Sequence, residues 1–127
     1  MFKSGTIYSN FTPLVKAPVI GYRISGDDVL NILKKITKKN FSKDHSLIRI
    51  VKIYQKDESI LDECSVVYFK SPKSFTGEDV CEIFLHGSPL IASQFEQLLK
   101  DLKVPDLRLA KNGEFSYRSV LNLSLIH

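Results

Sequence analysis

The sequence has few of the features that are typical of membrane proteins, secreted proteins or proteins stabilised by disulfides. Only two cysteines occur, Cys64 and Cys81, which is too few for a disulfide scaffold and favours a reducing compartment. No apolar run approaches the roughly 18 residues of a membrane span. The first residues have neither the apolar core of a signal peptide nor the arginines of a transit peptide. We therefore expect a protein with no membrane segment.

Motifs for nucleotide, metal or nucleophile chemistry are also missing. No Gly-x-x-x-x-Gly-Lys-Ser/Thr loop is present, so the chain has no GTP site of the P-loop type. The two cysteines and His86 occupy separate strand-like positions and do not have the spacing of a zinc site. No serine lies in a nucleophile elbow, and no pair of acidic residues has an obvious catalytic register. We predict neither a metal nor a catalytic residue.

What remains is the composition of one globular domain. The 127 residues are 43% hydrophobic and 25% charged. A chain of this length can bury a hydrophobic core that is stable without disulfides or bound metals. Lysine and arginine number 18 against 14 acidic residues, a net charge of +4. Such a balance permits an anionic partner but is too mild to indicate nucleic acid.

Hydrophobic spacing predicts three helices. Val29, Ile32, Leu33 and Ile36 form one apolar stripe, and the residues from Ser25 to Asp28 have the form of a capping box before it. A second helix is expected to begin after Ser88, which would be its N-cap, with Pro89 at the first helical position. A short third helix is predicted from Glu114, with Phe115, Val120 and Leu121 packed inward.

Strand-like runs fall between and before these helices. They are Thr6 to Tyr8, Val19 to Ile24, Leu47 to Tyr54, Cys64 to Phe69 and Val80 to His86. The order is β-β-α-β-β-β-α-(β)-α. It predicts an α+β domain with a mixed β-sheet and helices packed on one side.

Glu82 is unusual because it is a carboxylate in the middle of a predicted strand. Strand alternation places it on the same face as Val80, Phe84 and His86. One interpretation is an edge strand with Glu82 in water, since an unpaired buried charge is costly. The other is that Glu82 accepts hydrogen bonds from a ligand with adjacent N–H donors. Gly77 permits a sharp turn just before this strand.

Five other polar residues have a structural interpretation, and two of them also have a functional one. His86 and Ser88 stand where a strand becomes a helix, so they could flank an anion pocket or simply cap the turn. Arg23 ends a strand and would ordinarily be a surface group. Glu114 and Arg118 have the i, i+4 spacing of a helical ion pair, which accounts for them adequately.

Four motifs occur together in a fixed order. They are Gly21-x-Arg23-Ile24-Ser25-Gly26, Ser74-Phe75-Thr76-Gly77-Glu78-Asp79-Val80-x-Glu82, His86-Gly87 and Gly113-Glu114-Phe115-Ser116-x-Arg118. In this order and spacing the chain resembles the N-terminal domain of the MnmE (TrmE) family of tRNA modification GTPases. The resemblance runs from Thr6 to about Asn122, and its most specific part is the Ser-Phe-Thr-Gly-Glu-Asp block.

The resemblance implies a folate-binding and dimerising domain over residues 1–122, related in fold to the aminomethyltransferases, with a divergent tail over 123–127. It implies 5-formyltetrahydrofolate or a related reduced folate as cofactor, with Arg23 and Glu82 as its contacts. A homodimer is expected, and a MnmG-type flavoprotein and tRNA are partners of the full-length family. The location would be the bacterial cytoplasm or the mitochondrial matrix.

The chain departs from the family pattern in several places. The glycine-rich turn expected after Thr12 and Pro13 is replaced, and Ser88 and Asn112 stand where the family has glycine and proline. Ser124 occupies the position of a lysine that helps to bind folate. The family's helical domain, GTPase domain and C-terminal catalytic cysteine are not in this sequence. The alternatives are therefore a degenerate or truncated dimerisation module without a ligand, or an independent folate-dependent transferase.

Overall fold

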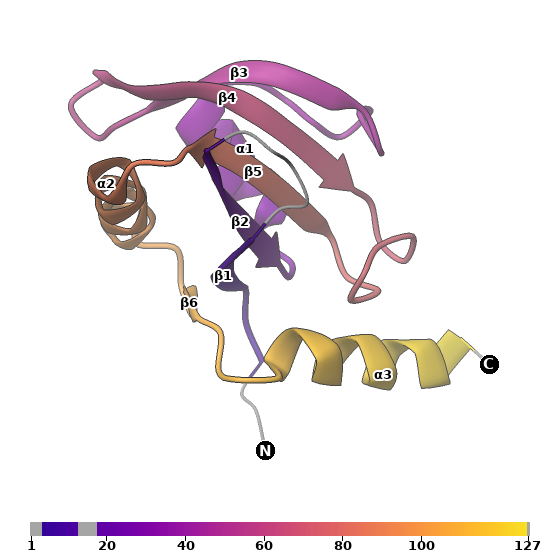
Figure 1. Cartoon of the computed structure of the whole chain (residues 1–127). Coiled ribbons are helices and arrows are strands. Elements are labelled where there is room, and N and C mark those ends of the chain that lie inside the picture. The colour runs from indigo at the N-terminus through magenta and orange to yellow at the C-terminus, as the bar shows by residue number, and fades with distance from the viewer. Residues whose placement is uncertain (1–3, 13–17, 127) are drawn as a thin grey trace.

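The computed structural model of the chain describes residues 4–12 and 18–126, with side chains described as far as residue 122. This part of the chain is an α+β domain with one mixed sheet of six strands and three helices (Figure 1). The elements are β1 (Ile7–Phe11), β2 (Val19–Ser25), α1 (Val29–Thr37), β3 (Ile48–Tyr54), β4 (Ile60–Phe69), β5 (Val80–His86), α2 (Pro89–Asp101), β6 (Arg108–Leu109) and α3 (Glu114–Ile126).

The strand order across the sheet is β3-β4-β5-β2-β1-β6. Neighbouring strands are antiparallel except β1 and β6, which are parallel, so the predicted mixed sheet is confirmed. β5 lies in the middle of the sheet, between β4 and β2. Its pairing with β2 sets Arg23 directly opposite Glu82 and Gly21 directly opposite Phe84.

One face of the sheet carries the core. The predicted stripe of α1 is fully buried, and Phe95, Leu98 and Leu99 of α2 join it against Tyr22 and Ile83 of the sheet. Each buried side chain of this size contributes about 1.5–3 kcal/mol to folding. The prediction that helices pack on one side is confirmed for α1 and α2. It is wrong for α3, which lies beyond one end of the sheet (Figure 1).

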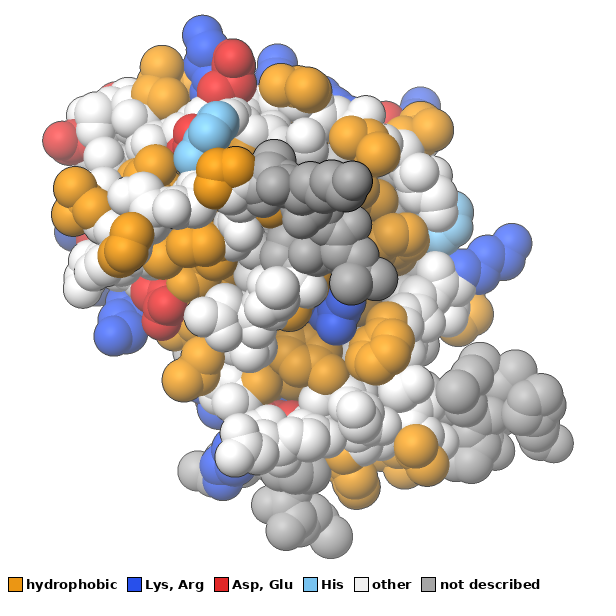
Figure 2. Space-filling view, viewed as in Figure 1, with side chains coloured by type: hydrophobic (Ala, Val, Ile, Leu, Met, Phe, Trp, Pro, Cys, Tyr) orange, Lys and Arg blue, Asp and Glu red, His pale blue; other side chains and the backbone are white. Residues whose placement is uncertain are grey.

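The opposite face, here called the open face, is covered by no helix in the part of the chain that the structure describes. Strand alternation brings Arg23, Glu82, Phe84 and Val67 to it, together with two isoleucines of β3. Those isoleucines, Ile48 and Ile50, are 72% and 71% exposed. Figure 2 shows hydrophobic side chains gathered on the side of the molecule away from α1.

The predicted N-cap of α2 is confirmed, whereas that of α1 is not. Ser88 caps α2 as predicted, because its hydroxyl accepts a hydrogen bond from the Ile91 N–H at 3.4 Å and Pro89 opens the helix. The prediction of a capping box before α1 is wrong. Ser25 is the last residue of β2, and the backbone N–H of Asp28 donates instead to Oγ1 of Thr6 at 3.0 Å.

The third helix is longer than predicted and differently attached. α3 has 13 residues, and its Val120 and Leu121 are exposed, so their predicted inward packing is wrong. Phe115 is partly buried. Polar contacts of Glu114, Arg118 and Asn122, described below, connect the described part of this helix to the rest of the domain.

The strands were predicted closely. β5 has its predicted bounds, while β4 begins at Ile60 rather than Cys64 and β1 extends to Phe11. β4 is longer because the turn before it is tight: the N–H of Gln55 donates to the carbonyl of Ser59 at 2.8 Å, so pairing starts at once. None of the described helices is long and apolar enough to cross a bilayer.

Candidate functional site

Arg23 and Glu82 form an ion pair on the open face. Nε and Nη2 of Arg23 lie 2.9 and 2.8 Å from the same carboxylate oxygen, Oε2 of Glu82. The two side chains are only 25% and 20% exposed. The structure therefore brings the two predicted site residues together. The interpretation of Glu82 as a solvated residue on an edge strand is wrong, because β5 is central.

The ion pair uses only half of the carboxylate. Both contacts from Arg23 go to Oε2, and Oε1 of Glu82 accepts no hydrogen bond from any residue that the structure describes. An ionised carboxylate has about four lone-pair sites and no donor of its own. Oε1 can thus accept hydrogen bonds from N–H groups of a ligand, while Arg23 holds the carboxylate in one orientation.

Two aromatic rings flank the Arg23 guanidinium. Its Cζ lies 4.6 Å from the ring centre of Phe11 and 5.0 Å from that of Phe75, both within the range of cation–π contact. The Phe11 ring also meets Phe84 edge-on at 5.9 Å. A β-carbon at Gly21 would lie 2.7 Å from the Phe11 ring, so glycine there lets that ring lie over β2. Together these rings offer flat surfaces beside the ion pair.

A hollow lies next to these residues on the same face. It has a volume of about 560 Å³ and is lined mainly by Val19, Ile48, Ile50, Val67 and Phe84. His86 also lines it. Its walls are chiefly apolar, so the open face combines a polar pair with a wide apolar surface.

Phe75 belongs to the loop between β4 and β5. Gly77 of this loop has φ +81°, which confirms the predicted turn. The loop is tied to itself, since the hydroxyl of Ser71 donates to the Gly77 carbonyl at 2.9 Å. It is also tied to β2, where the Ser25 hydroxyl contacts Oγ1 of Thr76 and Oε1 of Glu78, both at 2.7 Å.

An ionic cluster with a buried centre, Glu114 and Arg118, joins this loop to α3. Glu114 and Arg118 are paired at 3.4 Å, as their spacing predicted. Arg108 also holds Glu114, through Nη1 and Nη2 at 2.8 and 2.6 Å, and Nη1 of Arg118 lies 3.0 Å from Oε1 of Glu78. Hydrogen bonds from Arg108 lower the pKa of the fully buried Glu114 to about 2.

Sequence reasoning did not identify Glu78 and Arg108 as members of this cluster. Glu78 is 40 residues from Arg118 in the chain, so no helical or strand spacing links the two. The available signal was an acidic residue directly after the Gly77 turn. A second acid, Asp79, stands beside it, and its side chain instead accepts from the Ser71 N–H at 2.9 Å.

His86 and Ser88 have structural partners. Nδ1 of His86 lies 2.8 Å from Oδ1 of Asp62, and the backbone N–H of His86 donates to Oδ2 of the same residue at 2.9 Å. A carboxylate at this position disfavours a second anion. With Ser88 acting as a cap, the turn-capping interpretation accounts for both residues.

The thiols of Cys64 and Cys81 are not activated as nucleophiles or metal ligands. Burial raises the pKa of Cys64 to about 12 and also raises the pKa of Cys81, so neither side chain is a thiolate at neutral pH. Within residues 4–12 and 18–126, no group of three His, Cys, Asp or Glu side chains is placed to hold a metal ion.

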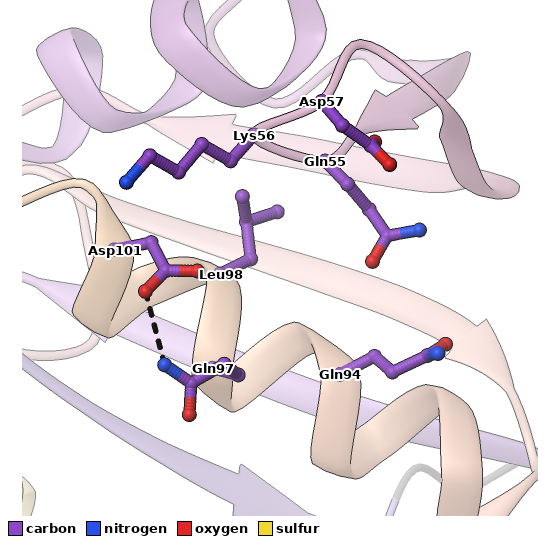
Figure 3. Close-up of a pocket in the computed structure, with 7 residues that line it drawn as sticks. All are labelled: Gln55, Lys56, Asp57, Gln94, Gln97, Leu98 and Asp101. Carbon is purple, nitrogen blue, oxygen red and sulfur yellow. Dashed lines mark hydrogen bonds between the residues drawn. The ribbon is translucent and has the colours of Figure 1, made fainter.

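A second hollow, of about 270 Å³, lies between the turn that joins β3 to β4 and the helix α2 (Figure 3). Its lining is polar, with Gln97 donating to Asp101 at 3.0 Å, and it holds none of the predicted site residues. Two further expectations lie outside the described part of the chain. They are the altered turn after Thr12, in residues 13–17, and the side chain of Ser124.

Comparison with known proteins places these features in context. Residues 6–123 match the family model described as "GTP-binding protein TrmE N-terminus". The tRNA modification GTPase MnmE of Helicobacter pylori strain HPAG1 is 46% identical over 118 residues, which cover 92% of this chain and 24% of that protein. The MnmE of Rickettsia canadensis is 39% identical over 117 residues, covering 92% and 26%. The chain thus spans about a quarter of the length of these relatives.

Proposed function

The chain belongs to the TrmE N-terminal family, and from this membership we propose that it is the folate-binding and dimerising module of a tRNA modification protein. The cofactor would be 5-formyltetrahydrofolate or a related reduced folate. The observation that carries the proposal is the ion pair of Arg23 and Glu82, which holds a carboxylate oxygen available on the open face.

The side chains of the open face suit a pterin. The edge of a pterin ring presents adjacent N–H donors, which match the acceptor oxygen Oε1 of Glu82 in a charge-assisted hydrogen bond. Arg23 would meet an acceptor or a negative group of the same ligand. Phe11 and Phe75 would offer flat apolar surfaces to the ring. When bound, the folate would supply a one-carbon unit, and these residues would bind and orient it.

The apolar part of the open face supports dimerisation. Ile48 and Ile50 are exposed beside Val67 and Phe84, and exposed apolar patches of this kind mark association sites. We propose a second copy of the chain as the occupant. The homodimer would cover the two isoleucines and leave the ion pair near the edge of the interface.

The activity of the whole relatives goes beyond this module. Their name assigns them tRNA modification and GTPase activity, and this chain spans about a quarter of their length. We propose that the chain contributes the folate module to tRNA modification, with a MnmG-type flavoprotein and tRNA as partners of the assembly.

Calorimetric titration of 5-formyltetrahydrofolate into the purified chain tests the proposal. Glu82→Gln and Arg23→Ala should each weaken binding by about tenfold or more, because each removes a charge-assisted contact. Glu58→Gln is the matched control, since it makes the same chemical change in the exposed turn at the far end of β4. Unchanged affinity in both site variants would contradict the assigned site. A dimer with no affinity for folate would favour a purely structural dimerisation module.

A further inference from the structure

Two polar side chains of α3 hold the loop between β4 and β5. Nη1 of Arg118 lies 3.0 Å from Oε1 of Glu78, and Nδ2 of Asn122 donates to the Thr76 carbonyl at 2.7 Å. Arg118 and Asn122 are four residues apart, so they occupy the same face of the helix. Successive turns of α3 thus bind loop residues on either side of Gly77.

These contacts are close, and each has one partner that is buried. The Arg118 side chain is 8% exposed, and Thr76 is fully buried. The loop also approaches the helix at Gly77 itself, where a β-carbon would lie 2.6 Å from Cβ of Asn122. A glycine with φ +81° is therefore required at the point of contact.

The same loop carries Phe75, one of the two rings over Arg23. Phe75 directly precedes the fully buried Thr76 in the chain. Phe75 itself is 51% exposed, so its side chain has little packing of its own. Its ring centre nevertheless lies 5.0 Å from Cζ of Arg23. The position of this ring must then depend on the residues that fix the neighbouring backbone, which are Ser25 on one side and α3 on the other.

We infer that Arg118 and Asn122 are positioning residues: they hold the loop between β4 and β5 so that Phe75 lies over the Arg23 guanidinium. Under the proposed function, on which this consequence rests, the two residues set one wall of the folate site without touching the ligand. Glu114 and Arg108 support Arg118 from the other side and complete the connection between α3 and the site.

Fluorescence tests the positioning without any ligand. The chain contains no tryptophan, so Phe75→Trp introduces a single indole at the loop. In that background Asn122→Ala and Arg118→Met should raise quenching by acrylamide by up to about twofold, because the loop opens locally and a position that is already 51% exposed can at most about double its exposure. Arg118→Lys keeps the charge and should retain part of the protection. The control Lys111→Met removes the same charge from an exposed position on the segment before α3 and should leave the quenching unchanged.

Binding tests the consequence for the site. With Phe75 in place, Asn122→Ala should weaken binding of 5-formyltetrahydrofolate by about fivefold, the cost of ordering a loose side chain on association. Lys111→Met should bind as the unaltered chain does. If the unaltered chain binds no folate, the proposed function fails, and the quenching measurement still decides the positioning role.

The inference is overturned if the indole is quenched equally in the Phe75→Trp chain and after adding Asn122→Ala or Arg118→Lys. Circular dichroism establishes that each compared variant is folded. Should Arg118→Met prevent folding, the two milder variants decide the question, because each alters a single contact to the loop.

Discussion

The guanidinium of Arg23 contacts Glu82 through one carboxylate oxygen only, with Nε at 2.9 Å and Nη2 at 2.8 Å from Oε2. The two residues face each other directly in the register of β2 and β5. This arrangement neutralises a carboxylate in the middle of a sheet and fixes its orientation, while its other oxygen accepts no hydrogen bond from the described residues. Arg108, by contrast, engages both oxygens of Glu114, the bidentate geometry that is frequent in such pairs.

A double-mutant cycle measures what this pair contributes to folding. Because both side chains are partly exposed, we expect a coupling of about 0.5–1 kcal/mol between Arg23→Ala and Glu82→Gln in urea unfolding. The double variant should then be only slightly less stable than Arg23→Ala alone. Strictly additive losses would show that the two groups do not interact in solution.

The open face should carry the dimer interface. Ile50→Asp places a charge among the apolar residues of that face, where burying it would be costly, so the chain should sediment as a monomer. Leu90→Asp is the matched control, because Leu90 is similarly exposed on α2, away from the open face. Sedimentation velocity distinguishes the two variants. Equal dimer content in Ile50→Asp and in the unaltered chain would exclude this face as the interface.

Local patterns predicted most of this fold. The apolar stripe beginning at Val29, the cap at Ser88 and the alternation along β5 depend on residues close together in the chain, and the structure confirms all three. The family motifs also led to Arg23 and Glu82, which the structure brings into contact. Their role in binding folate stays a prediction.

Errors arose where distant residues compete for a side chain. Ser25 has the sequence context of a helix cap, but its hydroxyl is taken by Thr76 and Glu78 across the fold. α3 was expected to bury Val120 and Leu121, yet both are exposed, and Arg118 on the same helix contacts Glu78, 40 residues away in the chain. Such pairings follow from the way the chain folds back on itself, which no local spacing encodes.

The charge on Glu114 makes stability depend on acid pH. Its pKa is lowered to about 2 in the folded chain, against 4.5 for the ordinary group, so its contribution is present above about pH 4.5 and is lost as the pH falls towards 2. The shift corresponds to about 3 kcal/mol. Glu114→Gln should therefore lower the free energy of unfolding by about that amount at pH 7 and by little near pH 2.

Urea unfolding at a series of pH values measures this difference. Glu58→Gln, at an exposed ion pair, should change stability little across the same range. A gap between Glu114→Gln and the unaltered chain that stays constant from pH 7 to pH 2 would contradict the account of the ionic cluster.

Substitutions at two glycines distinguish the stability cost of backbone strain from that of steric crowding. Gly77 and Gly113 have φ of +81° and +77°, but only Gly77 has atoms within 4 Å of a would-be β-carbon, the nearest being Cβ of Asn122. Gly113→Ala should cost about 1–2 kcal/mol from the left-handed conformation alone. Gly77→Ala should cost clearly more, because the loop must also move away from α3. Equal losses in chemical denaturation would argue against a tight contact between loop and helix.

Mapping the folate on the surface of the chain tests the central claim most directly. In a titration of the ¹⁵N-labelled chain with 5-formyltetrahydrofolate, followed by NMR, the Nε–H signal of Arg23 and the backbone amides of Phe75 and Glu82 should shift most. Signals of the polar hollow at Gln94 and Gln97 should stay in place and serve as the internal reference. Shifts confined to that hollow, or no shifts at a folate concentration well above micromolar, would contradict a folate site at the ion pair of Arg23 and Glu82.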